Sequence, residues 1–217
     1  MTEQHLRKQI IKVALAMNSL GINRGTSGNV SARWNRGFLI TPSGLRYEDT
    51  KAADIVFVDP AGNPRGKLAP SSEWRFHHDL YRDRNDTHAI VHTHSSFATT
   101  LACLGKEVPA FHYMIAVAGG NSIRCAPYAT FGTQALSNNA LKALRDRKAC
   151  LLANHGMIAT GINLEKALSL AVEVESLCEQ YWRALQIGKP KILSGREMKT
   201  IIRKFRHYGQ ERKATGP

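Results

Sequence analysis

The run Ala89-Ile90-Val91-His92-Thr93-His94 is the most informative stretch of this chain, because a short apolar segment ends in two histidines. Residues 89–93 have the length and composition of a buried strand. Side chains two residues apart on a strand point to the same face, so His92 and His94 lie on one side. One metal ion could bind both imidazoles, although a His-x-His pair taken alone is more often two unrelated histidines.

A third histidine and a carboxylate occur elsewhere in settings that suit the same site. His155 follows the apolar run 149–153 and precedes Gly156, where the backbone can turn immediately after a short strand. Glu73 opens a helix-like stretch just after two serines. Three imidazoles and one carboxylate match the ligand count of a catalytic zinc site, in which one position can open for substrate. The hypothesis of a metalloenzyme depends on the fold bringing these four side chains together.

The composition suits one globular domain with a cationic surface. A chain of 217 residues can bury a sizeable core, and its formal net charge is +13. Such a charge favours anionic partners, namely phosphorylated small molecules, nucleic acid or acidic membranes. A solvated basic surface explains it equally well. The basic region over 189–213 lacks interleaved aromatic residues or a recognised motif, so we expect no nucleic-acid partner.

The sequence predicts neither export nor membrane insertion. Residues 1–12 are polar and charged, and no apolar run is long enough to span a bilayer. The four cysteines form no Cys-x-x-Cys pair, which favours buried free thiols over disulfides or a thiolate metal site. We therefore expect a cytoplasmic protein with no membrane partner.

The hydrophobic pattern predicts alternating helices and strands without a parallel βαβ signature throughout. Helices are expected over 5–20, 71–82, 95–104, 133–144 and 163–187 and after Ser194, and strands over 38–41, 55–58, 89–93 and 149–153. Ser71 or Ser72 is the expected N-cap of the second helix. The pattern indicates a three-layer α/β fold around one central sheet. We expect a single domain over 1–209 and a mobile tail over 210–217.

Three short segments rich in small and hydroxyl-bearing residues could together enclose a phosphate group. They cover residues 25–29, 41–44 and 70–72. Each offers hydroxyls and backbone N–H groups, and the third also precedes a predicted helix, whose N-terminus favours an anion. Taken singly, such segments are more often ordinary turns. None matches a Walker or dinucleotide fingerprint, so a nucleotide is not implied.

Eight segments that follow one another within residues 5–209 carry the most specific signal. They cover residues 25–31, 40–44, 71–77, 92–94, 112–116, 119–123, 126–133 and 155–156. With these segments the chain resembles the class II aldolase/adducin family, and within it the branch that acts on L-fuculose 1-phosphate. The resemblance implies a three-layer α/β/α fold with a central, mainly antiparallel sheet. It also implies a fourfold-symmetric homotetramer with active sites between subunits.

The resemblance further implies a role for each candidate site residue. His92, His94 and His155 would hold one Zn²⁺ per subunit. Glu73 would ligate the metal at rest, leave it when substrate binds and then act as the acid/base catalyst. Tyr113, delivered by the neighbouring subunit, would be the second catalytic residue. The phosphate would be bound by Thr26, Asn29, Ser43, Gly44, Ser71 and Ser72, and Phe131 and Tyr208 would lie in the substrate pocket.

The implied reaction is zinc-dependent retro-aldol cleavage of a ketose 1-phosphate, with L-fuculose 1-phosphate as the first choice. The products would be dihydroxyacetone phosphate and L-lactaldehyde. Departures from the family pattern at Thr93, Ser95-Ser96 and Asn154 spare the ligands and leave 5-deoxyribulose 1-phosphate or 5-methylthioribulose 1-phosphate as alternatives. A sugar-phosphate epimerase or dehydratase is less favoured, since the epimerases typically carry Asp in place of Glu73. A non-catalytic adducin-like scaffold is least favoured, because that branch has lost the metal ligands.

Overall fold

An eight-stranded sheet forms the centre of the computed structural model, which describes residues 1–205. Its order is β4-β3-β2-β1-β5-β10-β9-β8, and all neighbours are antiparallel except β8 and β9. The strands are β1 (Asn29–Trp34), β2 (Gly37–Ile40), β3 (Val56–Val58), β4 (Pro64–Arg65), β5 (Ala89–Thr93), β8 (Cys125–Ala126), β9 (Ala149–Leu152) and β10 (Gly156–Gly161). Strands β6 (Val108–Pro109) and β7 (Ser122–Ile123) pair separately. The expectation of a mainly antiparallel central sheet is confirmed.

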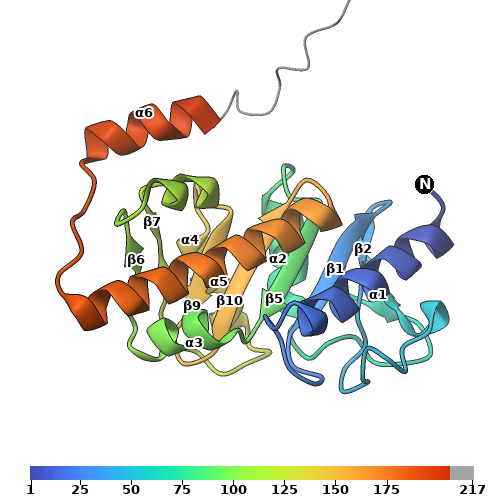
Figure 1. The fold of residues 1–217 in the computed structure, drawn as a ribbon. Helices are drawn as coiled ribbons and strands as arrows, with labels where there is room; N and C mark the ends of the chain where they lie inside the picture. The colour runs from blue at the N-terminus through green and yellow to red at the C-terminus, as the bar shows by residue number, and fades with distance from the viewer. Residues whose placement is uncertain (206–217) are drawn as a thin grey trace, which may run out of the picture.

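Helices cover both faces of this sheet and give the expected three layers (Figure 1). One face packs against α1 (Glu3–Ser19), α3 (Ser96–Cys103) and α5 (Leu164–Ile187), and the other against α2 (Trp74–Asp83) and α4 (Gln134–Ala143). Two short 3-10 helices, η1 (Ala52–Asp54) and η2 (Tyr113–Ala118), lie in the connections. Helix α6 (Gly195–Phe205) contacts η2, and its Met198 belongs to the core on the face of α1, α3 and α5 (Figure 1).

Alternation along the strands separates an apolar face of the sheet from a partly polar one. Val30 of β1 and Val91 of β5 join the core under α1, α3 and α5. Their neighbours Asn29, Ser31 and His92 point to the opposite face, toward α2, because successive side chains on a strand alternate. These three polar side chains are buried. The strand pattern therefore places a polar cluster between the centre of the sheet and the start of α2.

The predicted elements agree with the structure in position, with differences at several ends. Helix α5 begins after Asn163, the first residue of its predicted range, whose side chain caps it, and Gly21 follows α1 in a left-handed conformation. The prediction that Ser71 or Ser72 caps α2 is wrong: Glu73 is the N-cap residue, and no side chain caps it. The Ser71 hydroxyl instead accepts hydrogen bonds from the Asn29 amide and the Glu73 backbone, because it belongs to the polar cluster.

The burial of the four cysteines agrees only in part with the expectation of buried free thiols. All four cysteines are free thiols, and Cys150 and Cys178 are buried as predicted. Cys125 is half-buried, and Cys103, the last residue of α3, is exposed. In residues 1–205 no helix has both the length and the apolar character needed to cross a membrane. The predicted tail at 210–217 lies outside the described residues.

Candidate metal centre

Four side chains from three separate segments converge at one end of the sheet. His92 lies on β5 and His94 just beyond it, His155 lies in the turn between β9 and β10, and Glu73 precedes α2. One ligand atom from each of these residues lies within 4.8 Å of the others. The fold thus brings together the four ligands suggested by the sequence, although about 20 to 80 residues separate the segments that carry them.

The three imidazoles surround a common point with nearly threefold symmetry. Each pair of ring centroids is 4.9 Å apart, and the ring planes meet at 74° to 78°. Nε2 of His92 is 3.0 Å from Nε2 of His94. The Glu73 carboxylate lies against the same point, with Oε2 3.0 Å from Nε2 of His92 and Oε1 3.0 Å from Nε2 of His155. All four side chains therefore present ligand atoms to one small volume.

These residues fit a zinc ion by both geometry and chemistry. Four ligands held tetrahedrally at ordinary Zn–N and Zn–O bond lengths lie about 3.3 Å apart, close to the separations here. Oε1 of Glu73 is buried and has no hydrogen-bond partner, although a nitrogen is close by. An orphaned carboxylate oxygen is costly unless a cation satisfies it. Three imidazole nitrogens and one carboxylate oxygen are the donors that Zn²⁺ commonly takes.

The electrostatics of the cluster also suit a bound cation. Burial alone would raise the pKa of the Glu73 carboxyl, but His92 and His155 hold it well below its usual range. Burial, His92 and His155 lower the pKa of His94 to about 4, so this imidazole is neutral at pH 7. An anionic carboxylate and a neutral imidazole are the protonation states in which these groups ligate a metal. Burial would lower the pKa of His92, but Glu73 raises it overall, so the cluster favours a positive charge beside Glu73. A bound metal ion would supply that charge in place of a proton.

Backbone contacts fix the orientation of the ligands. Nδ1 of His92 lies 2.8 Å from the Met157 carbonyl oxygen and donates to it, which leaves a free lone pair on Nε2.

The turn before β10 is made by Asn154, whose φ is 54°, so the expectation that Gly156 makes this turn is wrong. Gly156 is instead required by close approach, since a Cβ there would lie 2.4 Å from the Thr93 carbonyl oxygen.

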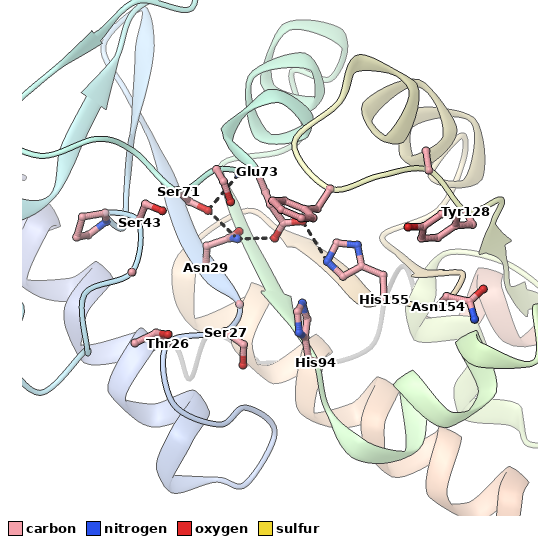
Figure 2. Close-up of a pocket in the computed structure, with 16 residues that line it drawn as sticks. Thr26, Ser27, Asn29, Ser43, Ser71, Glu73, His94, Tyr128, Asn154 and His155 are labelled. Carbon is pink, nitrogen blue, oxygen red and sulfur yellow. Dashed lines mark hydrogen bonds and ion pairs between the residues drawn. The ribbon is translucent and has the colours of Figure 1, made fainter.

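A cavity of about 360 Å³ adjoins the cluster. It is lined by Thr26, Ser27, Gly28, Asn29, Pro42, Ser43, Gly44, Ser71, Ser72, Glu73, His94, Tyr128, Ala129, Phe131, Asn154 and His155. All six residues predicted to bind phosphate are among them. Figure 2 shows the hydroxyls of Thr26, Ser27, Ser43 and Ser71 on one side of Glu73 and His155, and Tyr128 and Asn154 on the other. The cavity can therefore hold a molecule with an anionic group at one end and a metal-binding oxygen in its middle.

The remaining predicted residues have different positions. Phe131 lines the cavity and is 64% exposed. Tyr113, at the start of η2, is 51% exposed and is not part of the cavity lining. Tyr208 lies outside the described residues. Tyr128 and Asn154 were missed as site residues, although Tyr128 belongs to the 126–133 segment and Asn154 precedes a predicted ligand.

Comparison with known proteins agrees with this geometry. Residues 8–182 match the family described as Class II Aldolase and Adducin N-terminal domain. A 5-methylthioribulose-1-phosphate/5-deoxyribulose-1-phosphate aldolase from Rhodospirillum rubrum is 56% identical, over 98% of this chain and 96% of that protein. An L-fuculose phosphate aldolase from Escherichia coli K12 is 51% identical, over 96% of this chain and 98% of that protein.

Solved structures extend the similarity to the fold. A structure of L-fuculose 1-phosphate aldolase superposes with a TM-score of 0.91 at 41% identity, covering 93% of this chain and 96% of that one. The matched residues, 8–182, include the eight-stranded sheet, the four converging side chains and the residues that line the cavity. The chain therefore belongs to the class II aldolase and adducin family.

Proposed function

We propose that this protein is a zinc-dependent aldolase that cleaves a ketose 1-phosphate to dihydroxyacetone phosphate and an aldehyde. The single observation that carries the proposal is the cavity in which Glu73, His94 and His155 adjoin a row of hydroxyls. An adducin-like scaffold would have no use for three converging imidazoles and a buried, orphaned carboxylate oxygen. A zinc ion held by His92, His94, His155 and Glu73 would supply Lewis-acid stabilisation of the negative charge that develops beside the ketone.

The two ends of the cavity would bind different halves of the substrate. On this proposal the hydroxyls of Thr26, Ser43, Ser71 and Ser72, the Asn29 amide and the backbone at Gly44 hold the phosphate. Dihydroxyacetone phosphate is then the half that extends from these loops to the histidines. The aldehyde half extends toward Tyr128 and Asn154, on the opposite side of the histidines (Figure 2).

The proton transfers of retro-aldol cleavage would be divided between two residues. As the C3–C4 bond breaks, Tyr113 of a neighbouring subunit, entering the step as the phenolate, accepts the proton of the C4 hydroxyl, and C4 becomes the aldehyde carbon. The electron pair of the broken bond stays with the ketone half. Glu73 takes up a proton from solvent, to which Tyr113 returns the one it accepted, and passes it to C3. Tyr113 does not line the cavity of its own chain, so this assignment requires an oligomer. A cytoplasmic homotetramer with sites between subunits is part of the proposal.

The preferred substrate differs from the one expected from the sequence alone. The Rhodospirillum relative shares 56% identity and the Escherichia coli relative 51%. Tyr128, Ala129 and Phe131, which line the cavity together with Asn154, offer mainly apolar surface. Both observations favour 5-deoxyribulose 1-phosphate and 5-methylthioribulose 1-phosphate, whose aldehyde halves lack the hydroxyl of lactaldehyde. L-fuculose 1-phosphate becomes the second choice.

The test is a coupled assay for released dihydroxyacetone phosphate with all three ketose phosphates. We expect turnover that a chelator abolishes and added Zn²⁺ restores. Values of kcat/KM rank the substrates, because specificity is a ratio of these values. Absence of chelator-sensitive release from all three would refute the proposed function. A kcat/KM that is highest for L-fuculose 1-phosphate would refute the substrate order and leave the aldolase reaction in place.

A further inference from the structure

A network of hydrogen bonds between buried polar side chains extends from the core to the metal centre. Nε2 of His77 lies 2.5 Å from Oδ1 of Asn29, and Nδ1 of His77 lies 2.7 Å from the Ser31 hydroxyl. The Ser31 hydroxyl lies 2.8 Å from the Tyr81 hydroxyl. At the other end, Nδ2 of Asn29 donates to Oε2 of Glu73, at 3.0 Å. His77 is 0% exposed and does not line the cavity.

The chemistry of the groups determines which atom donates in each hydrogen bond between Glu73, Asn29, His77 and Ser31. An ionised carboxylate only accepts, so the atom of Asn29 that faces Glu73 must be the amide nitrogen. Oδ1 of Asn29 then faces His77 and can only accept. Burial lowers the pKa of His77 to about 3, so the imidazole is neutral and carries one N–H. That N–H must be on Nε2, and Nδ1 must accept from Ser31.

Asn29 is consequently held in one of its two amide orientations by His77. Its two N–H groups donate to Glu73 and to the Ser71 hydroxyl, both at 3.0 Å. A reversed amide would point its oxygen at the Glu73 carboxylate and repel it. Ser71 depends less on Asn29, because its hydroxyl also accepts from the Glu73 backbone N–H at 3.3 Å. Oε2 of Glu73 also lies 3.0 Å from Nε2 of His92, but that nitrogen carries the free lone pair of the ring, so Asn29 is the donor that orients the carboxylate.

We propose that His77 is a positioning residue: through Asn29 it sets the orientation of the Glu73 carboxylate. With Oε2 of Glu73 held by Asn29, Oε1 remains without a hydrogen bond and is the oxygen left for the metal. The role of Glu73 in turnover rests on the proposed function, whereas its orientation does not. Partners of metal ligands commonly affect metal affinity or activity by about 10- to 100-fold.

Two substitutions of His77 separate positioning from packing. His77→Phe keeps a planar ring between Phe38 and Phe76, both of which stack on His77, but it removes the donor to Asn29. We expect kcat to fall about 10- to 100-fold, with KM changed much less, and zinc affinity to fall about 10-fold. His77→Gln retains an N–H near the position of Nε2, and it should recover most of both losses. Zinc affinity is measured by competition with a chromophoric chelator.

A control variant reports the effect of destabilising the same helix. Ser137→Ala removes a buried hydrogen bond to Asp79 on another face of α2 and touches neither His77 nor Asn29. It should leave kcat and zinc affinity near those of the unsubstituted protein. Equal losses in His77→Phe and His77→Gln, or a comparable loss in Ser137→Ala, would overturn the positioning role in favour of packing.

The experiment also distinguishes this inference from the proposed function. If the unsubstituted protein cleaves none of the three ketose phosphates, the proposed function fails. Zinc affinity that falls in His77→Phe and returns in His77→Gln would then still support the positioning of Glu73. If the unsubstituted protein is active but His77→Phe matches it in kcat and in zinc affinity, the inference about His77 fails alone.

Discussion

At the scale of the residue, Glu73 is the side chain whose replacement bears most directly on the proposed reaction. Glu73→Gln preserves the shape of the side chain and an oxygen that accepts from Asn29, but it cannot exchange a proton. With three histidines left, we expect zinc to be retained. Turnover should fall about 10²- to 10⁴-fold, the usual contribution of a positioned acid/base group. Metal content and release of dihydroxyacetone phosphate are measured on the same sample, and near-normal turnover would remove Glu73 from its role.

Gly156 is important because it has no side chain, and not because of any chemical group that it carries. A Cβ at this position would lie 2.4 Å from the Thr93 carbonyl oxygen and 2.9 Å from Cδ2 of His94. Gly156→Ala must therefore displace β5 or His94. We expect a loss of stability of about 1–3 kcal/mol and about 10-fold weaker zinc binding. Denaturant unfolding and chelator competition measure the two effects.

Gly188→Ala is the matched control for that substitution. Its backbone is extended, and a Cβ there would meet nothing within 4 Å. It should change neither stability nor zinc affinity measurably. If Gly156→Ala behaved in the same way, close approach of β10 to β5 would not be what locates His94.

The ligand residues could be predicted from the sequence, whereas their supports could not. A His-x-His pair after an apolar strand places two imidazoles on one face by strand geometry alone. His77 was left without a role, because its partner Asn29 is 48 residues away in the chain and nothing in the local pattern links them. The left-handed conformation of Asn154 was equally hidden, since asparagine adopts it only where the surrounding hairpin requires it.

At the scale of the element, Asp79 joins α2 to α4. Its carboxylate accepts from the Ser137 hydroxyl at 2.7 Å and from the Gln134 amide at 2.6 Å. Burial would raise the pKa of Asp79, but these donors, together with His78 and Arg82, lower it overall. A lowered pKa contributes stability above the unfolded value of about 3.9, and that stability is lost as pH falls through the folded value.

Asp79→Asn tests whether the link between α2 and α4 makes the stability of the protein depend on pH. We expect the variant to be less stable than the unsubstituted protein at pH 7. The difference should shrink below about pH 4, where the unfolded chain takes up a proton that the folded carboxylate, with its lowered pKa, does not yet bind. Denaturant unfolding with a chelator present isolates this effect from metal loss. A difference in unfolding free energy that stays constant from pH 7 to pH 3 would contradict the assignment.

The sequence also predicted the helices better than the strands, since it predicted neither of the six-residue strands β1 and β10. Helices α1, α4 and α5 carry caps and apolar periodicity within their own sequence, so local signals suffice. Strand β1 was missed because the side chains it turns toward α2 are polar, which hides the pattern of a central strand. Strands β4, β6, β7 and β8 have two residues each, and only tertiary pairing defines them.

At the scale of the whole molecule, the cavity of one chain is an incomplete site for the proposed reaction. Tyr113 and Phe131 are large aromatic residues that are half-exposed or more. Tyr113 does not contribute to the cavity lining of its own chain. If a neighbouring subunit supplies Tyr113, each site combines Glu73 of one chain with Tyr113 of the next. Two variants that are inactive for different reasons should then complement each other.

The experiment mixes Glu73→Gln and Tyr113→Phe proteins, dissociates them together and allows them to reassociate. In a ring of randomly mixed subunits, about a quarter of the sites pair an intact Glu73 with an intact Tyr113 of the neighbour, so activity should return to about that fraction. Sites within single chains would show no recovery, because every chain lacks one of the two residues. Each variant taken alone through the same cycle controls for refolding. Recovery in the mixture alone would therefore place Tyr113 across the interface, whereas an inactive mixture of reassembled oligomers would return it to its own chain.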